Sequence, residues 1–226
     1  MNIDLVQYMK SRYLEKNSPS HDPGPVITIS REIGCPGKKV AQLLTEYLNQ
    51  KSSKKDYWKW IGKEIFDEAA KELELPVTHV KNVFKTDRGI IDQIVSAQTQ
   101  KFYKNDLKVR KTIGQVIRAM ANDGHVVILG RGGVALTRDI SHSLHIFLEA
   151  PLQWRVSLIS EKQGYNLEEA KKYVLLMDKR RAKYRDYYQG KNTDYTWYDI
   201  KFNCMTLSAE EIVEAIIKVM EIRKLI

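Results

Sequence analysis

Short apolar runs alternate along the chain with stretches of helical periodicity. Runs rich in branched or aromatic residues occur at 26–29, 125–129 and 143–148, with weaker candidates at 57–60 and 199–203. Such runs need burial on both faces, as the central strands of a parallel sheet have. Because strands and helices alternate, the pattern predicts an α/β fold of three layers around a mostly parallel sheet of about five strands.

Capping signals indicate where several helices begin and end. Asn166 and Glu169 have the spacing of a capping box and open a long helix through about Tyr188. The segment 208–211 has the same spacing and opens the last helix. Asp123-Gly124 closes a helix that starts near Thr112, after a region of several helices over 62–111, and Pro151 stands at an expected first helical position.

The first 25 residues form a separate N-terminal segment in this prediction. Residues 3–16 have helical spacing, and the Pro- and Ser-rich run 18–25 ends that helix and links it to a domain over 26–226. The start of the chain has no apolar core of a signal peptide, and no window holds eighteen apolar residues in a row. We therefore expect neither secretion nor a membrane span.

Composition narrows the class of protein. Hydrophobic residues make up 43% of the chain, which disfavours disorder. Cys35 and Cys204 are too few for a disulfide framework and form no zinc motif, so we expect a reducing, cytoplasmic location.

The formal net charge of +9 is concentrated in two segments. Residues 51–111 hold 14 basic and 9 acidic residues, and residues 151–192 hold 10 and 5. Both a nucleic-acid-binding protein and an enzyme that grips phosphates from two sides would have this distribution.

The loop after the first strand has the parts of a phosphate-binding loop. Gly34 and Gly37 let backbone N–H groups turn inward, the following helix N-terminus is electropositive, and Lys38 adds a full charge. Only half of the usual P-loop motif is present, since Glu32 occupies the first glycine position and Lys39 the Ser/Thr position. A simple turn joining strand to helix remains an alternative.

Five blocks follow one another along about residues 26–220: ITISREIGCPGKKVAQLL, VVILGRGG, HIFLEAPLQWRV, MDKRRAKYRDYY and YDIKFNCMTLSAEEIVEAI. In this order they resemble the cytidylate kinase-like family, relatives of the nucleoside monophosphate kinases within the P-loop fold. The resemblance implies a three-layer P-loop kinase fold with a helical acceptor-binding insertion over 61–111 and a lid at about 178–196. It also implies ATP and Mg²⁺ as cofactors, although the protein ligand of the metal is unknown.

The resemblance further implies roles for individual residues. Lys38 matches the basic residue after the last loop glycine, and Arg181 and Arg185, on one helix face, match lid arginines that stabilise charge on the donor phosphates. Arg131, after the apolar strand 126–129, matches the arginine that holds the acceptor, with Arg31 and Glu32 beside it. The expected donor site comprises Gly34, Cys35, Pro36, Gly37, Lys38, Lys39, Arg155 (stacked on the base) and Arg180.

Our leading hypothesis is transfer of the ATP γ-phosphoryl group to a nucleoside monophosphate, CMP-like, or a similar small acceptor. Two alternatives stay open. A catalytically weak nucleotide-binding protein is favoured by the missing Ser/Thr and by Gly37, which stands where true cytidylate kinases have the catalytic lysine. A nucleic-acid-binding domain is favoured by the two basic segments and by aromatic residues near the lid. Nucleotides are the expected partners, rather than nucleic acid or membrane.

Overall fold

The computed structural model describes residues 24–52, 56–63, 100–189 and 197–226. The chain divides into two compact units, residues 1–23 with 63–116 and residues 24–62 with 117–226. The expected helix at 3–16, its linker up to residue 23 and most of the segment 61–111 lie outside the described residues. Among the helices that are described, none is both long and apolar enough to cross a membrane.

The second unit is built on a five-stranded parallel sheet in the order β2-β3-β1-β4-β5. Val26, at the start of β1, is in register with Val126 of β3 on one side and with Ser143 of β4 on the other. The order places the first strand in the centre, and the sheet confirms the prediction of an α/β fold. The strands are β1 (Val26–Arg31), β2 (Lys59–Ile61), β3 (Val126–Leu129), β4 (Ser143–Glu149) and β5 (Ile200–Asn203).

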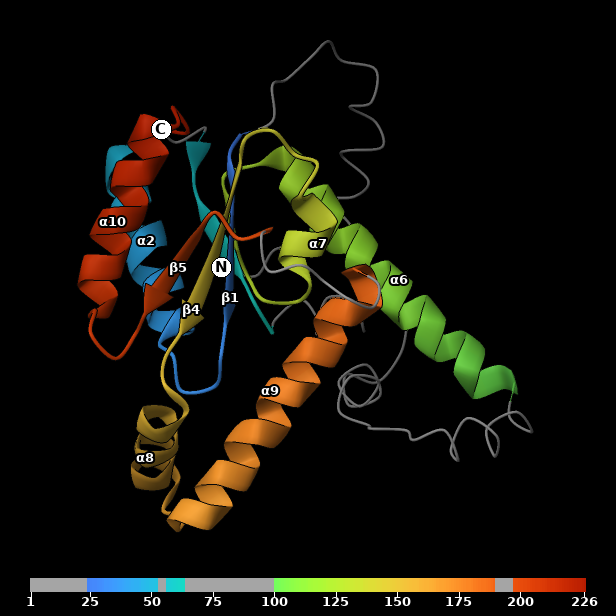
Figure 1. Cartoon of the computed structure of the whole chain (residues 1–226). Helices are drawn as coiled ribbons and strands as arrows, with labels where there is room; N and C mark the ends of the chain where they lie inside the picture. The colour runs from blue at the N-terminus through green and yellow to red at the C-terminus, as the bar shows by residue number, and fades with distance from the viewer. Residues whose placement is uncertain (1–23, 53–55, 64–99, 190–196) are drawn as a thin grey trace. The chain divides into compact units, whose positions relative to one another are not determined.

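Helices cover both faces of this sheet, which explains why its inner strands are apolar on successive positions. The helices α2 (Gly37–Lys51) and α10 (Ala209–Ile222) pack together on one face, and α7 (Gly133–Thr137) packs on the other (Figure 1). Ile27 and Ile29 on β1 are fully buried in the core beneath α2 and α10. The predicted three layers are therefore present.

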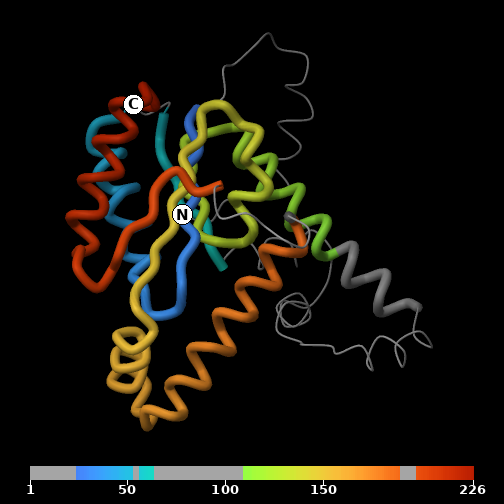
Figure 2. The backbone as a smooth tube through the Cα atoms, in the orientation of Figure 1, coloured from blue at the N-terminus to red at the C-terminus, as the bar shows by residue number. Residues whose placement is uncertain are grey.

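Two further helices stand at the end of the sheet where the parallel strands finish. The chain leaves β4, forms α8 (Leu152–Gln163), turns at Gly164 and continues as α9 (Leu167–Gln189). Figure 2 shows both helices at the end where β1 enters the loop before α2. The carboxyl ends of the strands are the usual place for a ligand in an open α/β sheet.

The capping predictions are confirmed, and several boundaries differ. The Asn166 amide donates to Glu169 and the Glu169 amide donates to Asn166, and Ser208 and Glu211 form a full capping box. Pro151 is the N-cap of α8 rather than its first residue. The helix expected to start near Thr112 starts earlier, as α6 (Gln100–Asp123). It is continuous because no proline or glycine interrupts residues 100–113.

A buried histidine joins the two central strands. His145 on β4 is 6% exposed, its Nδ1 lies 2.8 Å from Thr28 Oγ1 on β1, and its Nε2 lies 3.1 Å from Ser143 Oγ. Burial lowers the pKa of His145 below its ordinary value of 6.5, nearby Asp199 opposes this shift, and Arg223 adds to it. The imidazole therefore belongs to the folded protein in its neutral form.

We predict that this histidine makes stability depend on pH. Below the ordinary pKa of 6.5 the unfolded chain binds the proton before the folded protein does, so this contribution is full above that pH and decreases as pH falls. In thermal unfolding between about pH 7 and 5, His145→Gln should lose less stability on acidification than the wild type. The control is His142→Gln at an exposed position. Equal acid sensitivity of all three proteins would contradict this.

Candidate active site

The loop between β1 and α2 is partly closed on itself. The Cys35 amide donates to Glu32 O at 3.4 Å, the Gly37 amide donates to Cys35 O at 2.9 Å, and the Ile33 amide donates to Asp178 Oδ1 at 2.8 Å. Within the described part of the chain, the amides of Gly34, Lys38 and Lys39 have no hydrogen-bond acceptor. The loop therefore offers a smaller cradle than a fully open run of amides would.

Glycine is required at the first turn of this loop. Gly34 has a φ of +94°, a conformation that side chains rarely adopt, and a Cβ there would lie 3.4 Å from Arg155 Cβ. The helix α2 then begins at Gly37 with Pro36 as N-cap and no side-chain cap. The amides of Lys38 and Lys39 in the first turn of α2 therefore remain available, at the positive end of the helix dipole.

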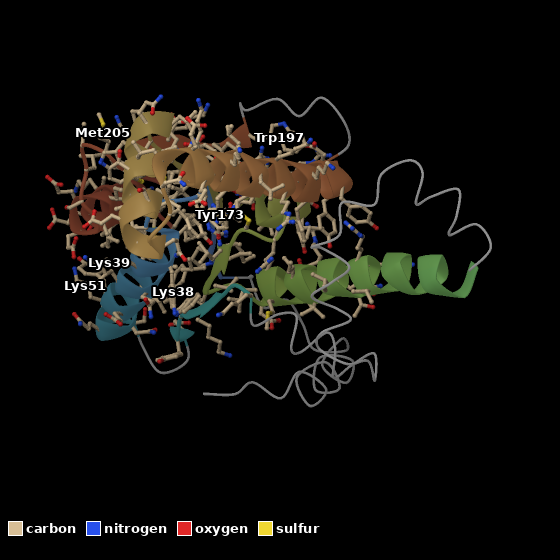
Figure 3. All side chains as sticks on the ribbon, turned by 90° about the horizontal axis from the view of Figure 1, so that it is seen from below. Lys38, Lys39, Lys51, Tyr173, Trp197 and Met205 are labelled. Atoms are coloured by element: carbon tan, nitrogen blue, oxygen red, sulfur yellow. The ribbon has the colours of Figure 1, made fainter. Side chains whose placement is uncertain are left out.

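The two lysines of the loop point away from its centre. Lys38 Nζ lies 5.9 Å from the centre of the Trp60 ring, within cation–π range, and Lys39 Nζ pairs with Glu210 on α10 at 2.7 Å. Figure 3, which looks toward the carboxyl ends of the strands, shows both lysines at the start of α2. A catalytic role for Lys38 stays a prediction, and it requires the side chain to leave Trp60.

Three arginines from three elements come together at the carboxyl ends of β1 and β3. Burial and the charges of Arg181 and Arg131 lower the pKa of Arg31 to about 9. Burial also lowers the pKa of Arg181, whose Nη1 donates to Arg31 O at 2.9 Å. Like charges held this close in a half-buried site favour binding of an anion, which would relieve their repulsion.

A left-handed turn brings the backbone close to this cluster. Gly130, Arg131 and Gly132 have φ values of 73°, 59° and 71°. A Cβ at Gly130 would collide with the Arg31 guanidinium, and one at Gly132 would come within 2.5 Å of Tyr188 Cδ2 on α9. Positive φ at a non-glycine residue is a strained conformation of the kind that often occurs at functional sites.

Arg155 lies in an ion-pair network rather than on an exposed surface. Arg155 is 5% exposed. Its Nε donates to Ala150 O at 2.9 Å and lies 3.1 Å from Glu32 Oε2. Its Nη1 donates to Asp178 Oδ2 at 2.5 Å. Stacking on a donor base stays a prediction, and it would need the guanidinium to leave both carboxylates. Asp178 was not among the site residues predicted from the sequence.

The two cysteines meet beneath the loop. A hydrogen bond between the thiols raises the pKa of Cys35 and lowers that of Cys204, and burial further raises the pKa of Cys35. Both are free cysteines, and Cys35 packs against the main core cluster, to which Cys204 belongs. Cys35 is therefore a packing residue of the loop in its thiol form.

The structure describes only part of the segment predicted to be a lid. Arg180 Nη1 contacts Met177 Sδ at 3.9 Å within α9, and Arg185 is half-buried on the same helix. Residues 190–196 of the predicted lid lie outside the described residues. Arg181 thus donates a hydrogen bond to Arg31 O. The hydrogen bond that the structure describes for Arg180 is to Met177, not to Arg31, Arg131 or Arg181.

The residue that stands at the magnesium-binding position of the usual P-loop is paired with another group of this chain. No group of three or more His, Cys, Asp or Glu side chains is placed among the described residues as metal ligands. Lys39, which replaces the magnesium-binding Ser/Thr, is paired with Glu210, and Glu32 is held by Arg155 and the Ala150 amide. Magnesium in kinases is bound largely through the nucleotide phosphates and water, so we assign no step to it here.

The structure defines an α/β protein with a parallel sheet, whose cationic groups gather at the carboxyl ends of the strands, where such folds bind their ligands. The comparison with known families is more specific. Residues 26–206 match the family model described as the cytidylate kinase-like family, so this chain belongs to the cytidylate kinase-like family.

Individual relatives are more distant. The cytidylate kinase of Methanopyrus kandleri is 27% identical over 103 residues, which are 42% of this chain and 53% of that protein. The match thus spans about half the length of this curated relative.

Among solved structures, an uncharacterized protein from Eubacterium ventriosum is similar with a TM-score of 0.60 and 24% identity, over 87% of this chain and 98% of that one. This similarity supports the fold. A shikimate kinase from Bacteroides thetaiotaomicron has a TM-score of 0.48 and 13% identity over 87% and 98% of the two chains.

We predict that the contact between Gly132 and Tyr188 can be separated from backbone strain. Gly132→Ala and Gly164→Ala both force alanine into a left-handed conformation, with φ of 71° and 70°, but a Cβ at Gly164 meets nothing within 4 Å. Gly164→Ala should reduce the free energy of unfolding by about 1 kcal/mol. Gly132→Ala should cost about 1–3 kcal/mol more because Tyr188 must move. Equal losses in chemical denaturation would contradict the packing of α9 on this turn.

Proposed function

We propose that the protein transfers the γ-phosphoryl group of ATP to a nucleoside monophosphate, CMP-like, or a similar small phosphorylated acceptor. The observation that carries this proposal is the gathering of Arg31, Arg131 and Arg181, where burial, together with the charges of Arg181 and Arg131, lowers the pKa of Arg31 to about 9. Phosphoryl transfer needs alignment and positive charge around the transferred group more than it needs covalent chemistry. Membership of the cytidylate kinase-like family supports the same reaction class.

In the proposed reaction the β1–α2 loop binds the donor. The amides of Gly34, Lys38 and Lys39 donate hydrogen bonds to ATP phosphate oxygens, with the dipole of α2 behind them. Arg181, with Arg180 and Arg185 further along α9, offsets the charge that develops on the transferred group. Lys38 joins them only after its side chain leaves Trp60.

The acceptor site lies on the other side of Arg31. Arg131, held by the left-handed turn after β3, binds the acceptor phosphate, and Arg31 stands between the acceptor and donor sites. Glu32 acts on the acceptor indirectly, since its carboxylate is held by Arg155 and by the Ala150 amide. Fixed positive groups in a partly dry site would supply most of the rate acceleration.

A second candidate function has its own support. The placement of Lys38 over Trp60 and of Lys39 against Glu210 leaves the loop without a lysine directed at the phosphates. A protein with this loop could bind nucleotide and transfer phosphate very slowly. The two functions differ in turnover, not in binding.

A coupled ATP-consumption assay with a panel of monophosphates, including CMP, UMP, dCMP and AMP, distinguishes them. We predict acceptor-dependent turnover with at least one member of the panel. Binding of ATP by titration calorimetry without turnover for any acceptor would instead support the catalytically weak protein. Absence of both binding and turnover would refute both functions.

The arginine cluster is tested in the same assay with matched charge changes. Arg131→Gln removes a charge from the cluster, and Lys162→Gln removes one from an exposed position of α8. We expect Arg131→Gln to lower kcat/KM for the acceptor about 100-fold, as losing a charge-assisted hydrogen-bonding group commonly does. Lys162→Gln should leave it unchanged.

A further inference from the structure

We propose that Asp178 is a positioning residue that fixes the β1–α2 loop against α9, so that the loop amides and Arg181 are held at one separation. This inference rests on the proposed function for its catalytic meaning. The contacts themselves are independent of that function. They connect parts of the chain that are far apart in sequence.

Each oxygen of the Asp178 carboxylate has a separate partner. Oδ1 accepts the Ile33 amide at 2.8 Å, and Oδ2 accepts Arg155 Nη1 at 2.5 Å. The same Nη1 also lies 3.4 Å from Ile33 O. The peptide groups on both sides of Ile33 are therefore held, one directly by Asp178 and the other through Arg155.

Glu32 completes the network from the other side of the loop. Its Oε2 lies 3.1 Å from Arg155 Nε and accepts the Ala150 amide at 3.1 Å, and its own amide donates to Leu148 O at 3.0 Å. Arg155 thus has a carboxylate on each side. Breaking one pair in a buried network leaves a charge uncompensated, which is why such pairs fix geometry strongly.

Asp178 also sets the position of the lid arginine. Arg181 follows three residues later on α9, on the same helix face, and its Nη1 donates to Arg31 O at 2.9 Å. The charge of Asp178 opposes the lowering of the Arg181 pKa by burial. Asp178 and Arg181, on one face of α9, therefore contact the Ile33 amide and Arg31 O. The next amide along the chain is the free amide of Gly34.

The Ile33 amide anchors the loop rather than binding phosphate, because it already donates to Asp178. The next amide, Gly34, has a φ of +94° and no acceptor among the described residues. Anchoring one amide orients the next, which is the kind of preorganisation that phosphate binding requires.

Two substitutions separate the two roles of the carboxylate. Asp178→Asn keeps an oxygen for the Ile33 amide but removes the charge beside Arg155, whereas Asp178→Ala removes both. Asp186→Asn and Asp186→Ala are matched controls at an exposed position of the same helix. Full-length proteins are compared by steady-state kinetics with ATP and by hydrogen exchange of the Ile33 amide.

We expect Asp178→Asn to lower kcat/KM for ATP about 100-fold through misplacement of the loop, with the KM for the acceptor unchanged. Exchange at Ile33 should be faster in Asp178→Ala, and both controls should match the wild type. If the wild type transfers no phosphate, the proposed function fails and amide exchange alone decides on the anchor. Wild-type kinetics in Asp178→Asn, or unchanged Ile33 exchange in Asp178→Ala, would overturn the proposal.

Discussion

The burial of three like-charged arginines near one another is the constraint on which the rest of this site depends. Arg31, Arg131 and Arg181 come from a strand end, a glycine turn and a long helix, and burial, together with the charges of the other two, lowers the pKa of Arg31 to about 9. Such a group is costly to assemble unless carboxylates balance it or an anion binds it. Asp178 supplies part of the balance, since its charge opposes the lowering of the Arg181 pKa.

The backbone turn at residues 130–132, beside this cluster, has positive φ values that favour glycine. A Cβ at Gly130 would lie 2.2 Å from Arg31 Nη1 and would force the guanidinium to shift, and Arg131 itself is held at a φ of +59°. These features cost conformational energy, and they direct charge toward the carboxyl end of the sheet. The same end receives the electropositive start of α2, so backbone and side chains contribute with the same sign.

The sequence was sufficient for features that depend on neighbouring residues. The capping boxes at 166–169 and 208–211 and the apolar strands could be predicted because their partners are three residues apart or follow a short period. The arginine motif around 130–133 was also recognisable, through its resemblance to the cytidylate kinase-like family.

Side-chain destinations across the fold could not be predicted in this way. Asp178 and Ile33 are 145 positions apart, and nothing in the residues near Asp178 distinguishes it from other acids of a basic helix. Lys38 reaches Trp60 because β2 ends beside α2, which depends on the strand order. The contacts of Arg155 were equally unpredictable, because its two carboxylate partners, Glu32 and Asp178, come from the loop and from α9.

We propose that the free loop amides and Arg181 bind the donor phosphates and that Arg131 binds the acceptor phosphate beside them. The most direct measurement is a crystal structure of the protein grown with ADP and CMP. The account predicts phosphate oxygens within hydrogen-bonding distance of Arg131, Arg181 and the Gly34 amide. Phosphates bound elsewhere, with the arginines still packed as in the ligand-free protein, would contradict it.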